Sequence, residues 1–311
     1  MEDNKKKIIK IVVLVICIIV FLVSAGFIGW HFYENYKNNQ NLDELRGQVT
    51  EPTTPEDIII EEPKPDYSDV LAKNNETVGW ITIPGTRINH PVLQHPDDAN
   101  HSVNENYYLK HTFEKTYSIY GAIYMDYRND AVDLDTNTII HGHNGYNGTN
   151  FSDLAEYDSF EFYKEHPVVE FNTLEKYYKW KIYAVFITNA SASDDNGYVF
   201  NYVYPYLEGE NFDDFIKEVD KRSLYNTGVD IQRGDKLLTL STCCRNLDIT
   251  SKHENVRIVV LARAVRYGED ETVDVSKAFV NENPKYPQLY YRKHGLTNPY
   301  KNDERWYPEE G

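Results

Sequence analysis

Residues 237–244 read Leu-Leu-Thr-Leu-Ser-Thr-Cys-Cys and lead into a polar stretch, residues 245–255. Apolar and β-branched residues dominate the first part, so the sequence predicts a strand that ends at Cys243. The end of a strand holds a side chain rigidly at the rim of a sheet. A single cysteine is nevertheless more often a buried structural residue than a nucleophile, so its neighbours in the fold have to decide its role.

Short strands are predicted on both sides of this segment. They are rich in β-branched and aromatic residues, and turn signals such as Pro84-Gly85 separate them. The predicted strands cover residues 78–83, 89–92, 121–125, 138–141, 168–171, 177–189 and 256–265. Helical patches interrupt them at residues 151–157 and 211–224. The pattern predicts a mainly β domain, either a barrel or a sandwich.

A run of 20 uncharged residues, Ile11–Trp30, lies near the N-terminus. As a helix it would measure about 30 Å, which is enough to cross the hydrocarbon core of a bilayer. Four lysines, the last of them Lys10, precede it, which predicts one transmembrane helix with the N-terminus in the cytoplasm and the rest of the chain outside the cell. A cleavable signal peptide is the alternative, but the length of the run and the interfacial residues Trp30 and Tyr33 favour the anchor.

The chain divides into four predicted parts. Residues 1–33 form a cytoplasmic stub and the membrane anchor. Residues 34–65 are rich in Asn, Glu, Thr and Pro, which predicts a flexible stalk, with an edge strand at Ile58–Ile60 as the alternative. Residues 66–266 form the globular domain. Residues 267–311 are polar without a regular period, and the sequence assigns them no structure or role.

Charge and cysteine content exclude several classes of function. The net charge of -17 and the lack of a basic stripe argue against nucleic-acid binding. Cys17 lies in the apolar run, and Cys243 and Cys244 are adjacent, so no disulfide framework is predicted. No cluster of residues has the spacing of metal ligands, so we expect neither a metal nor a cofactor.

Two further features favour a catalytic role for Cys243, a histidine loop and an arginine. Residues 141–145 read His-Gly-His-Asn-Gly and follow a predicted strand. A single loop histidine is more often a surface residue, but a histidine loop combined with a strand-end cysteine is what catalysis by a thiol requires. Arg257 opens the next strand and lies near Cys243 if the two strands form a hairpin. It would then hold a thiolate or donate hydrogen bonds to an oxyanion, unless it is an ordinary surface arginine.

With these residues the chain resembles the sortases, which are cysteine transpeptidases of Gram-positive bacteria. The family signature Thr-Leu-X-Thr-Cys is matched by residues 239–243. The histidine of the family follows a glycine after a strand, as His143 does, and its arginine stands in the strand after the cysteine, as Arg257 does. His141 is the main rival of His143, and only the family's position after the glycine decides between them.

Within the family the chain is most similar to class B. The segments that carry this similarity are 78–86 (VGWITIPGT), 91–94 (PVLQ), 121–129 (GAIYMDYRN) and 139–151. The resemblance covers about residues 66–265. It implies a closed β-barrel of about eight strands with peripheral helices, preceded by the transmembrane helix.

The resemblance also implies a reaction. Cys243 would attack a Thr-containing sorting signal near the C-terminus of a secreted protein, with His143 as acid and base and Arg257 as cationic stabiliser. The new carboxyl would be joined to an amine of a peptidoglycan precursor or cross-bridge, which anchors the protein to the cell wall. Ser241 and Thr242 would line the substrate groove, with ordinary strand hydroxyls as the alternative.

Some features depart from the family, and other functions stay open. Cys244 stands where class B members often carry an acidic residue, and the loop before Arg257 is long. A class B-like pilin polymerase and a non-enzymatic, membrane-tethered adhesin remain alternatives. An L,D-transpeptidase fits poorly because its histidine and cysteine motifs are close neighbours, and a papain-like protease fits poorly because its signature is absent around Cys243.

Overall fold

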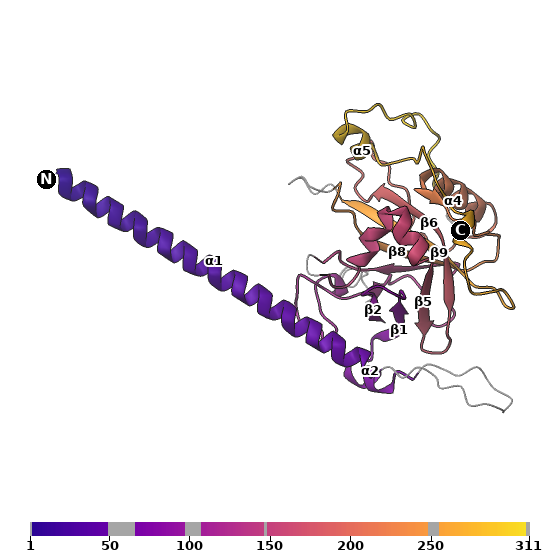
Figure 1. Ribbon diagram of the computed structural model, residues 1–311, viewed down its shortest axis with the longest axis horizontal. Helices are drawn as coiled ribbons and strands as arrows, with labels where there is room; N and C mark the ends of the chain where they lie inside the picture. The colour runs from indigo at the N-terminus through magenta and orange to yellow at the C-terminus, as the bar shows by residue number, and fades with distance from the viewer. Residues whose placement is uncertain (1, 49–65, 97–106, 146–147, 248–254, 309–311) are drawn as a thin grey trace. The chain divides into compact units, whose positions relative to one another are not determined.

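The computed structural model describes residues 2–48, 66–96, 107–145, 148–247 and 255–308 (Figure 1). The chain forms two compact units, Met1–Leu45 and Arg46–Gly311. The first unit is part of one long helix, α1 (Glu2–Arg46). This helix is long and apolar enough to cross a membrane.

Helix α1 extends past Tyr33, into residues for which the sequence predicts a flexible stalk. No proline or glycine stands between residues 30 and 46, and Gly47 follows directly. Since glycine and proline are the poorest helix formers, their positions explain both the extension and its end. The rest of the predicted stalk, including the alternative edge strand Ile58–Ile60, lies outside the described residues.

Eight strands of the second unit close into a barrel (Figure 1). They are β1 (Thr77–Thr82), β2 (Asn89–Leu93), β3 (Tyr124–Met125), β4 (Asn137–His141), β5 (Val168–Thr173), β6 (Lys179–Asn189), β8 (Leu237–Cys243) and β9 (Val256–Ala264). Their order is β1-β2-β3-β4-β8-β9-β6-β5, and the pairing of β1 with β5 closes the ring. The closed eight-stranded barrel is therefore confirmed, and the sandwich is excluded.

Two pairings in the barrel are parallel, β2 with β3 and β4 with β8, and the others are antiparallel. The parallel pair β4 and β8 needs a long crossover, which contains β5, β6 and the helix α4 (Gly209–Arg222). The crossover brings the carboxyl ends of β4 and β8 to the same rim, although about a hundred residues separate them in the sequence.

Helices cover the outside of the barrel. Helix α4 confirms the helix predicted at 211–224, and it packs on β6 through apolar residues such as Phe215 and Val219 (Figure 1). The helical patch predicted at 151–157 is the 3-10 helix η2 (Asp153–Asp158), followed by α3 (Phe160–Glu165). The remaining short helices are α2 (Ser68–Lys73), η1 (Tyr107–Leu109), η3 (Val275–Lys277) and α5 (Gln288–Lys293).

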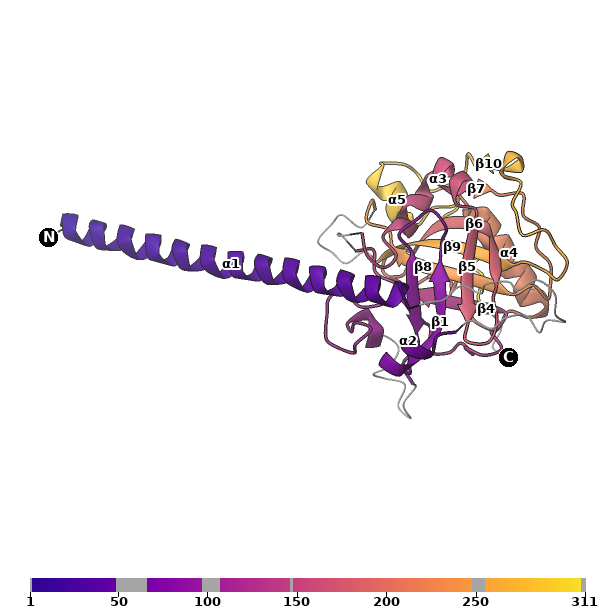
Figure 2. The same ribbon diagram turned by 60° about the horizontal axis from the view of Figure 1, so that its bottom comes forward.

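The segment after Arg266, for which the sequence predicts no structure, packs on the barrel domain. Its strand β10 (Phe279–Val280) pairs antiparallel with β7 (Tyr225–Asn226), and Figure 2 shows the two side by side. Leu289 of α5 is buried in the main hydrophobic core. Each of these contacts involves only a few residues, so no periodic pattern announces them in the sequence.

Strand β8 is buried along its length, and only Cys243 is partly exposed. Leu238 and Leu240 belong to the main core, whereas Leu237 belongs to the apolar cluster beneath α4. Both faces of the strand are covered, and its buried hydroxyls at Thr239, Ser241 and Thr242 are each hydrogen-bonded, as buried polar groups must be. The strand leaves the core at Cys243.

Candidate active site

Strand pairing brings the predicted residues to one end of the barrel. In the parallel ladder of β4 and β8, His141 stands opposite Ser241. Two residues further along each chain, His143 and Cys243 therefore reach the same rim. In the antiparallel ladder of β8 and β9, Cys243 stands opposite Arg257. The hairpin assumed for Arg257 is confirmed.

The histidine loop is hydrogen-bonded to the end of β8 on both sides of His143. The amide of Gly142 donates to the carbonyl oxygen of Ser241 at 3.2 Å. The side-chain amide of Asn144 donates to the carbonyl oxygen of Cys243 at 2.9 Å. These bonds extend the β4–β8 alignment beyond the last paired residues, and they hold the imidazole of His143 at the level of Cys243.

A cleft of about 510 Å³ opens at this rim. It is lined by Leu109, Tyr124, Asp126, Tyr127, Arg128, His141, Gly142, His143, Ala190, Tyr202, Val203, Ser241, Thr242, Cys243 and Arg257. All five residues predicted from the sequence for the site thus border one cavity, together with His141. Its volume lies in the range of small-molecule and peptide side-chain sites.

The two adjacent cysteines have different environments. Cys243 is partly exposed and lines the cleft, whereas Cys244 is only 4% exposed and belongs to the main core. Successive side chains of a strand point to opposite faces, which explains the difference. Cys244 therefore has the burial of a structural residue, and Cys243 has the access that a nucleophile needs.

The imidazole of His143 is fixed by one hydrogen bond. Its Nε2 lies 2.8 Å from the carbonyl oxygen of Leu109, so Nε2 carries the proton and donates it. Burial lowers the pKa of His143, the bond to Leu109 partly opposes this, and the positive charges of Arg257 and Arg245 lower the pKa further. Nδ1 is the ring nitrogen left for chemistry in the cleft.

The rival histidine lies in the same cleft but is bonded to a carboxylate. His141 Nε2 lies 3.3 Å from Asp126 Oδ2. Burial raises the pKa of Asp126, but hydrogen bonds from Arg128 and His141 outweigh burial and hold this pKa well below its usual range. Because Asp126 stays ionised, it fixes the orientation of His141 at the wall of the cleft. No sequence signal predicted this pair.

Arg257 lines the cleft, and its positive charge has few partners among the described residues. Its side chain is partly exposed, and its guanidinium donates to the carbonyl oxygen of Val256 at 3.3 Å. Within the part of the chain that the structure describes, no carboxylate lies within ion-pair distance of it. The guanidinium is therefore available to an anionic or polar group in the cleft.

Ser241 and Thr242 line the cleft, but their hydroxyls are bonded to the protein. Thr242 Oγ1 donates to the carbonyl oxygen of Gly142 at 2.8 Å, and Ser241 Oγ lies 3.0 Å from the hydroxyl of Tyr202. Tyr202 comes from the loop before α4, and no sequence signal marked it. The same holds for Leu109, whose role depends on its carbonyl and not on its side chain.

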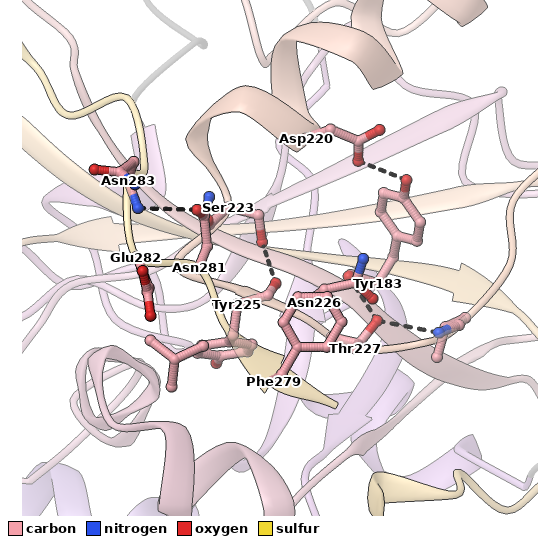
Figure 3. Close-up of a pocket in the computed structure, with 12 residues that line it drawn as sticks. Tyr183, Asp220, Ser223, Tyr225, Asn226, Thr227, Phe279, Asn281, Glu282 and Asn283 are labelled. Carbon is pink, nitrogen blue, oxygen red and sulfur yellow. Dashed lines mark hydrogen bonds between the residues drawn. The ribbon is translucent and has the colours of Figure 1, made fainter. Parts of the chain in front are cut away.

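A larger pocket of about 610 Å³ lies elsewhere on the domain, between α4, β7 and β10 (Figure 3). In it the hydroxyl of Tyr183 donates to Asp220 at 2.6 Å. No cysteine or histidine is among the described residues that line it. The smaller cleft is the better candidate because it alone of the two combines a thiol, an imidazole and a guanidinium. The described residues also contain no group of three His, Cys, Asp or Glu arranged to hold a metal ion.

Comparison with known proteins shows the family. Residues 81–265 match the family model of the sortase domain, which is more than half of the chain. The chain is 32% identical over 238 residues to sortase B of Listeria monocytogenes, an alignment that covers 76% of this chain and 89% of the relative. It is 33% identical over 204 residues to sortase B of Staphylococcus aureus, covering 65% of this chain and 76% of the relative.

Solved structures give the same result. The fold matches a Staphylococcus aureus sortase B–substrate complex with a TM-score of 0.60 and 27% identity, covering 75% of this chain and 99% of the other. It matches sortase B from B. anthracis with a TM-score of 0.59 and 26% identity, covering 76% of this chain and 99% of the other. The resemblance to class B is confirmed.

Proposed function

This chain belongs to the sortase family of cysteine transpeptidases, and we propose that it anchors surface proteins to the cell wall. It cleaves a Thr-containing sorting signal near the C-terminus of a secreted protein and joins the new carboxyl to an amine of peptidoglycan. The observation that carries the proposal is the cleft that Cys243, His143 and Arg257 line together.

The first half of the reaction forms a thioester. His143 Nδ1 takes the proton of the Cys243 thiol, and the resulting thiolate attacks the carbonyl carbon of the signal's threonine, so that a carbon–sulfur bond forms. The carbon–nitrogen bond then breaks, and the leaving amine takes a proton from His143. The C-terminal fragment departs, and the secreted protein stays bound to Cys243 as an acyl-enzyme.

His143 exchanges this proton through Nδ1. Its Nε2 is occupied by the carbonyl oxygen of Leu109, which fixes the tautomer and the ring plane. Its lowered pKa makes the imidazolium a stronger acid toward the leaving amine. The same lowered pKa makes the neutral imidazole the common form at neutral pH, which suits the base in the second half of the reaction.

Arg257 supplies positive charge where negative charge develops. The attack on the carbonyl creates an oxyanion, and a preorganised donor at such an oxyanion is worth about 10²- to 10³-fold in kcat. Arg257 stands opposite Cys243 in the ladder, and among the described residues it is not neutralised by a carboxylate. It therefore stabilises the oxyanion or the substrate backbone beside the thiolate.

The second half of the reaction transfers the acyl group. An amine of peptidoglycan loses a proton to His143 Nδ1 and attacks the thioester carbon. A carbon–nitrogen bond forms, the carbon–sulfur bond breaks, and Cys243 leaves as a thiolate. Cleavage by water instead of an amine would give simple hydrolysis.

Helix α1 sets the place of the reaction. It is a membrane anchor whose lysine-rich start stays in the cytoplasm, so the barrel works outside the cell next to emerging secreted proteins. In this proposal residues 1–33 are the stub and anchor, 34–65 the connection, 66–266 the catalytic domain and 267–311 an extension. Secreted proteins, peptidoglycan and the membrane are its partners.

A product assay tests the proposal. The full-length chain in detergent micelles is mixed with a library of Thr-containing sorting peptides and an amine acceptor, and ligated peptides are identified by mass. The Cys243→Ala variant should give no ligated product, and the matched variant Cys244→Ala should keep at least half of the activity. Ligated product from Cys243→Ala would overturn the proposal. Ligation to a pilin lysine peptide but not to a peptidoglycan fragment would replace wall anchoring by pilus assembly.

A further inference from the structure

The carbonyl that fixes His143 belongs to η1, and the residue before it is anchored outside the cleft. Tyr108 is 1% exposed. Its hydroxyl donates to Glu76 Oε2 at 2.6 Å and accepts from the side-chain amide of Asn74 at 3.0 Å. Glu76 and Asn74 lie between α2 and β1, so this hydroxyl ties η1, and with it Leu109, to another part of the barrel wall.

The hydrogen-bond partners of Glu76 keep its carboxylate ionised, so it stays an acceptor. Its Oε2 also lies 2.8 Å from His95 Nδ1, and its Oε1 accepts from Lys115 at 2.6 Å. Burial raises the pKa of Glu76, but the hydrogen bonds from Lys115, Tyr108 and His95 outweigh burial and lower it. Hydrogen bonds to an ionised acceptor are roughly twice as strong as neutral ones, so the bond to Tyr108 is a firm one.

Tyr107, the first residue of η1, has aromatic rings stacked on both of its faces. The ring of Tyr107 is stacked between His95 and His111, with ring centroids 3.9 Å apart on each side. His111 Nδ1 also lies 2.7 Å from the carbonyl oxygen of Tyr107. These contacts leave the short helix little freedom to turn about its own axis, which is the movement that would redirect the Leu109 carbonyl.

A glycine lies close to the same carbonyl. Gly121 has φ of +55°, and a Cβ there would lie 2.6 Å from the Leu109 carbonyl oxygen and 2.5 Å from that of Tyr108. The next amide, of Ala122, donates to the Tyr108 carbonyl oxygen at 2.8 Å. Only glycine allows this approach.

We propose that Tyr108, with Glu76 as its acceptor, is a positioning residue for His143. The pair fixes η1, η1 fixes the Leu109 carbonyl, and that carbonyl fixes the imidazole with Nδ1 toward the substrate. Tyr108 and Glu76 do not border the cleft, so they act through His143 and not on the substrate. We call Tyr108 and Glu76 together the brace. Its role in catalysis rests on the proposed function, whereas its effect on the orientation of the imidazole does not.

The Tyr108→Phe variant tests the brace because it removes only the hydroxyl. A misplacement of about 1 Å costs up to about 100-fold in rate, so a loosened carbonyl should lower kcat about tenfold and leave KM within about twofold. Glu76→Gln keeps an acceptor oxygen but loses the charge, so its kcat should lie between those of the wild type and of Tyr108→Phe. Glu76→Leu should behave like Tyr108→Phe.

The imidazole is observed directly by NMR on the full-length chain labelled with ¹⁵N-histidine, with His143 assigned by its loss in His143→Gln. The bond to Leu109 raises the pKa of His143, so loosening it in Tyr108→Phe should move this pKa further down. Arg257 and Arg245, the other groups that act on this pKa, are unchanged in the variant.

Two glycines provide a matched pair. Gly121→Ala should push the Leu109 carbonyl and lower kcat at least tenfold. Gly295 has a similar φ of +64° but no atom within 4 Å of its would-be Cβ, so Gly295→Ala carries the same backbone strain away from the brace and should keep kcat within about twofold.

The outcomes separate the two proposals. A Tyr108→Phe chain whose His143 pKa and tautomer equal those of the wild type would overturn the brace, whether or not its activity or stability changed. If the imidazole signals move but kcat does not, the brace exists without a catalytic role, and the inference fails. If His143→Ala itself keeps full activity, the proposed function fails, and the NMR result still reports on the geometry.

Discussion

Strand β9 carries two arginines of the same parity, and they lie in opposite environments. Arg257 stands opposite Cys243 at the cleft, is partly exposed and meets no carboxylate among the described residues. Arg263 stands opposite Leu237 at the other end and is 0% exposed. It donates to Asp230 at 3.0 Å and to Glu269 at 2.5 Å. One residue type on one face of one strand thus serves two purposes.

The two arginines differ in whether carboxylates neutralise their positive charge. At the Arg263 end the buried cation is fully hydrogen-bonded, as buried charges must be. At the cleft end the guanidinium, the imidazole Nδ1 and the thiol have hydrogen-bonding capacity that the described residues leave unused. We infer that changes at the cleft end lower activity and spare stability, whereas changes at the Arg263 end do the reverse.

The largest expected effect comes from the two histidines of the cleft end. His143→Ala removes the proposed acid and base and should lower kcat/KM by about 10²- to 10⁴-fold, without a change in thermal midpoint. His141→Ala removes a wall residue bonded to Asp126 and should cost less than tenfold. Initial rates of ligation and thermal unfolding of both variants measure this. Loss of activity in His141→Ala alone would exchange the roles of the two histidines.

Arg257→Ala should lower kcat by about 10²- to 10³-fold, because it removes the proposed donor for the oxyanion. Unfolding by urea should give the same midpoint as the wild type, since the guanidinium has little bonding within the described structure. Arg257→Lys keeps the charge but loses the planar donor pair, so we expect partial recovery. A strong loss of stability in Arg257→Ala would contradict the contrast with Arg263.

Arg263→Met should lower the free energy of unfolding by about 3 kcal/mol, because Glu269 and Asp230 lose a buried partner. The kcat of the folded variant should stay within about twofold of the wild type. Arg233→Met is the matched control, since the pair of Arg233 with Asp213 is exposed and its loss should change the free energy of unfolding far less. Equal losses in the two variants would remove the distinction between the buried and the exposed pair.

Acid should weaken the Arg263 end. Hydrogen bonds from Arg263 and Lys181 hold the pKa of Glu269 well below its ordinary value, and burial opposes them only in part. A lowered pKa in the folded state stabilises the fold above the unfolded pKa of about 4.3, and this stabilisation is lost as the pH falls through the folded value. Urea midpoints between pH 7 and pH 3 should fall more steeply for the wild type than for Glu269→Gln. Parallel curves would count against this linkage.

The sequence predicted what depends on local pattern or on a conserved motif of the family. The apolar run before Cys243 and the spacing of Phe212 and Val219 correspond to buried faces, so β8 and α4 were predicted near their true bounds. The barrel also placed the three predicted site residues at one cleft. The strand pattern alone could not choose between a barrel and a sandwich, because both use the same alternating strands, and only the resemblance to the family implied the barrel.

What the sequence missed depends on contacts between distant segments. The hydrogen bond between His143 and Leu109 uses a backbone carbonyl, which has no signature in the residue type. The pairing of β10 with β7 involves two residues on each side, too few for a period. The different burial of Cys243 and Cys244 follows from the alternation of side chains along a strand, but only once the buried side of β8 is known.

The most direct test of the account is to trap and locate the acyl-enzyme. The full-length chain is incubated with the library of Thr-containing sorting peptides and without an amine, quenched in acid and digested, and the modified cysteine is identified by tandem mass spectrometry. The account predicts a thioester on Cys243 alone, stronger in Arg257-containing chains than in Arg257→Ala and absent in Cys243→Ala. An adduct on Cys244, or turnover of the peptides with no adduct on Cys243, would contradict it.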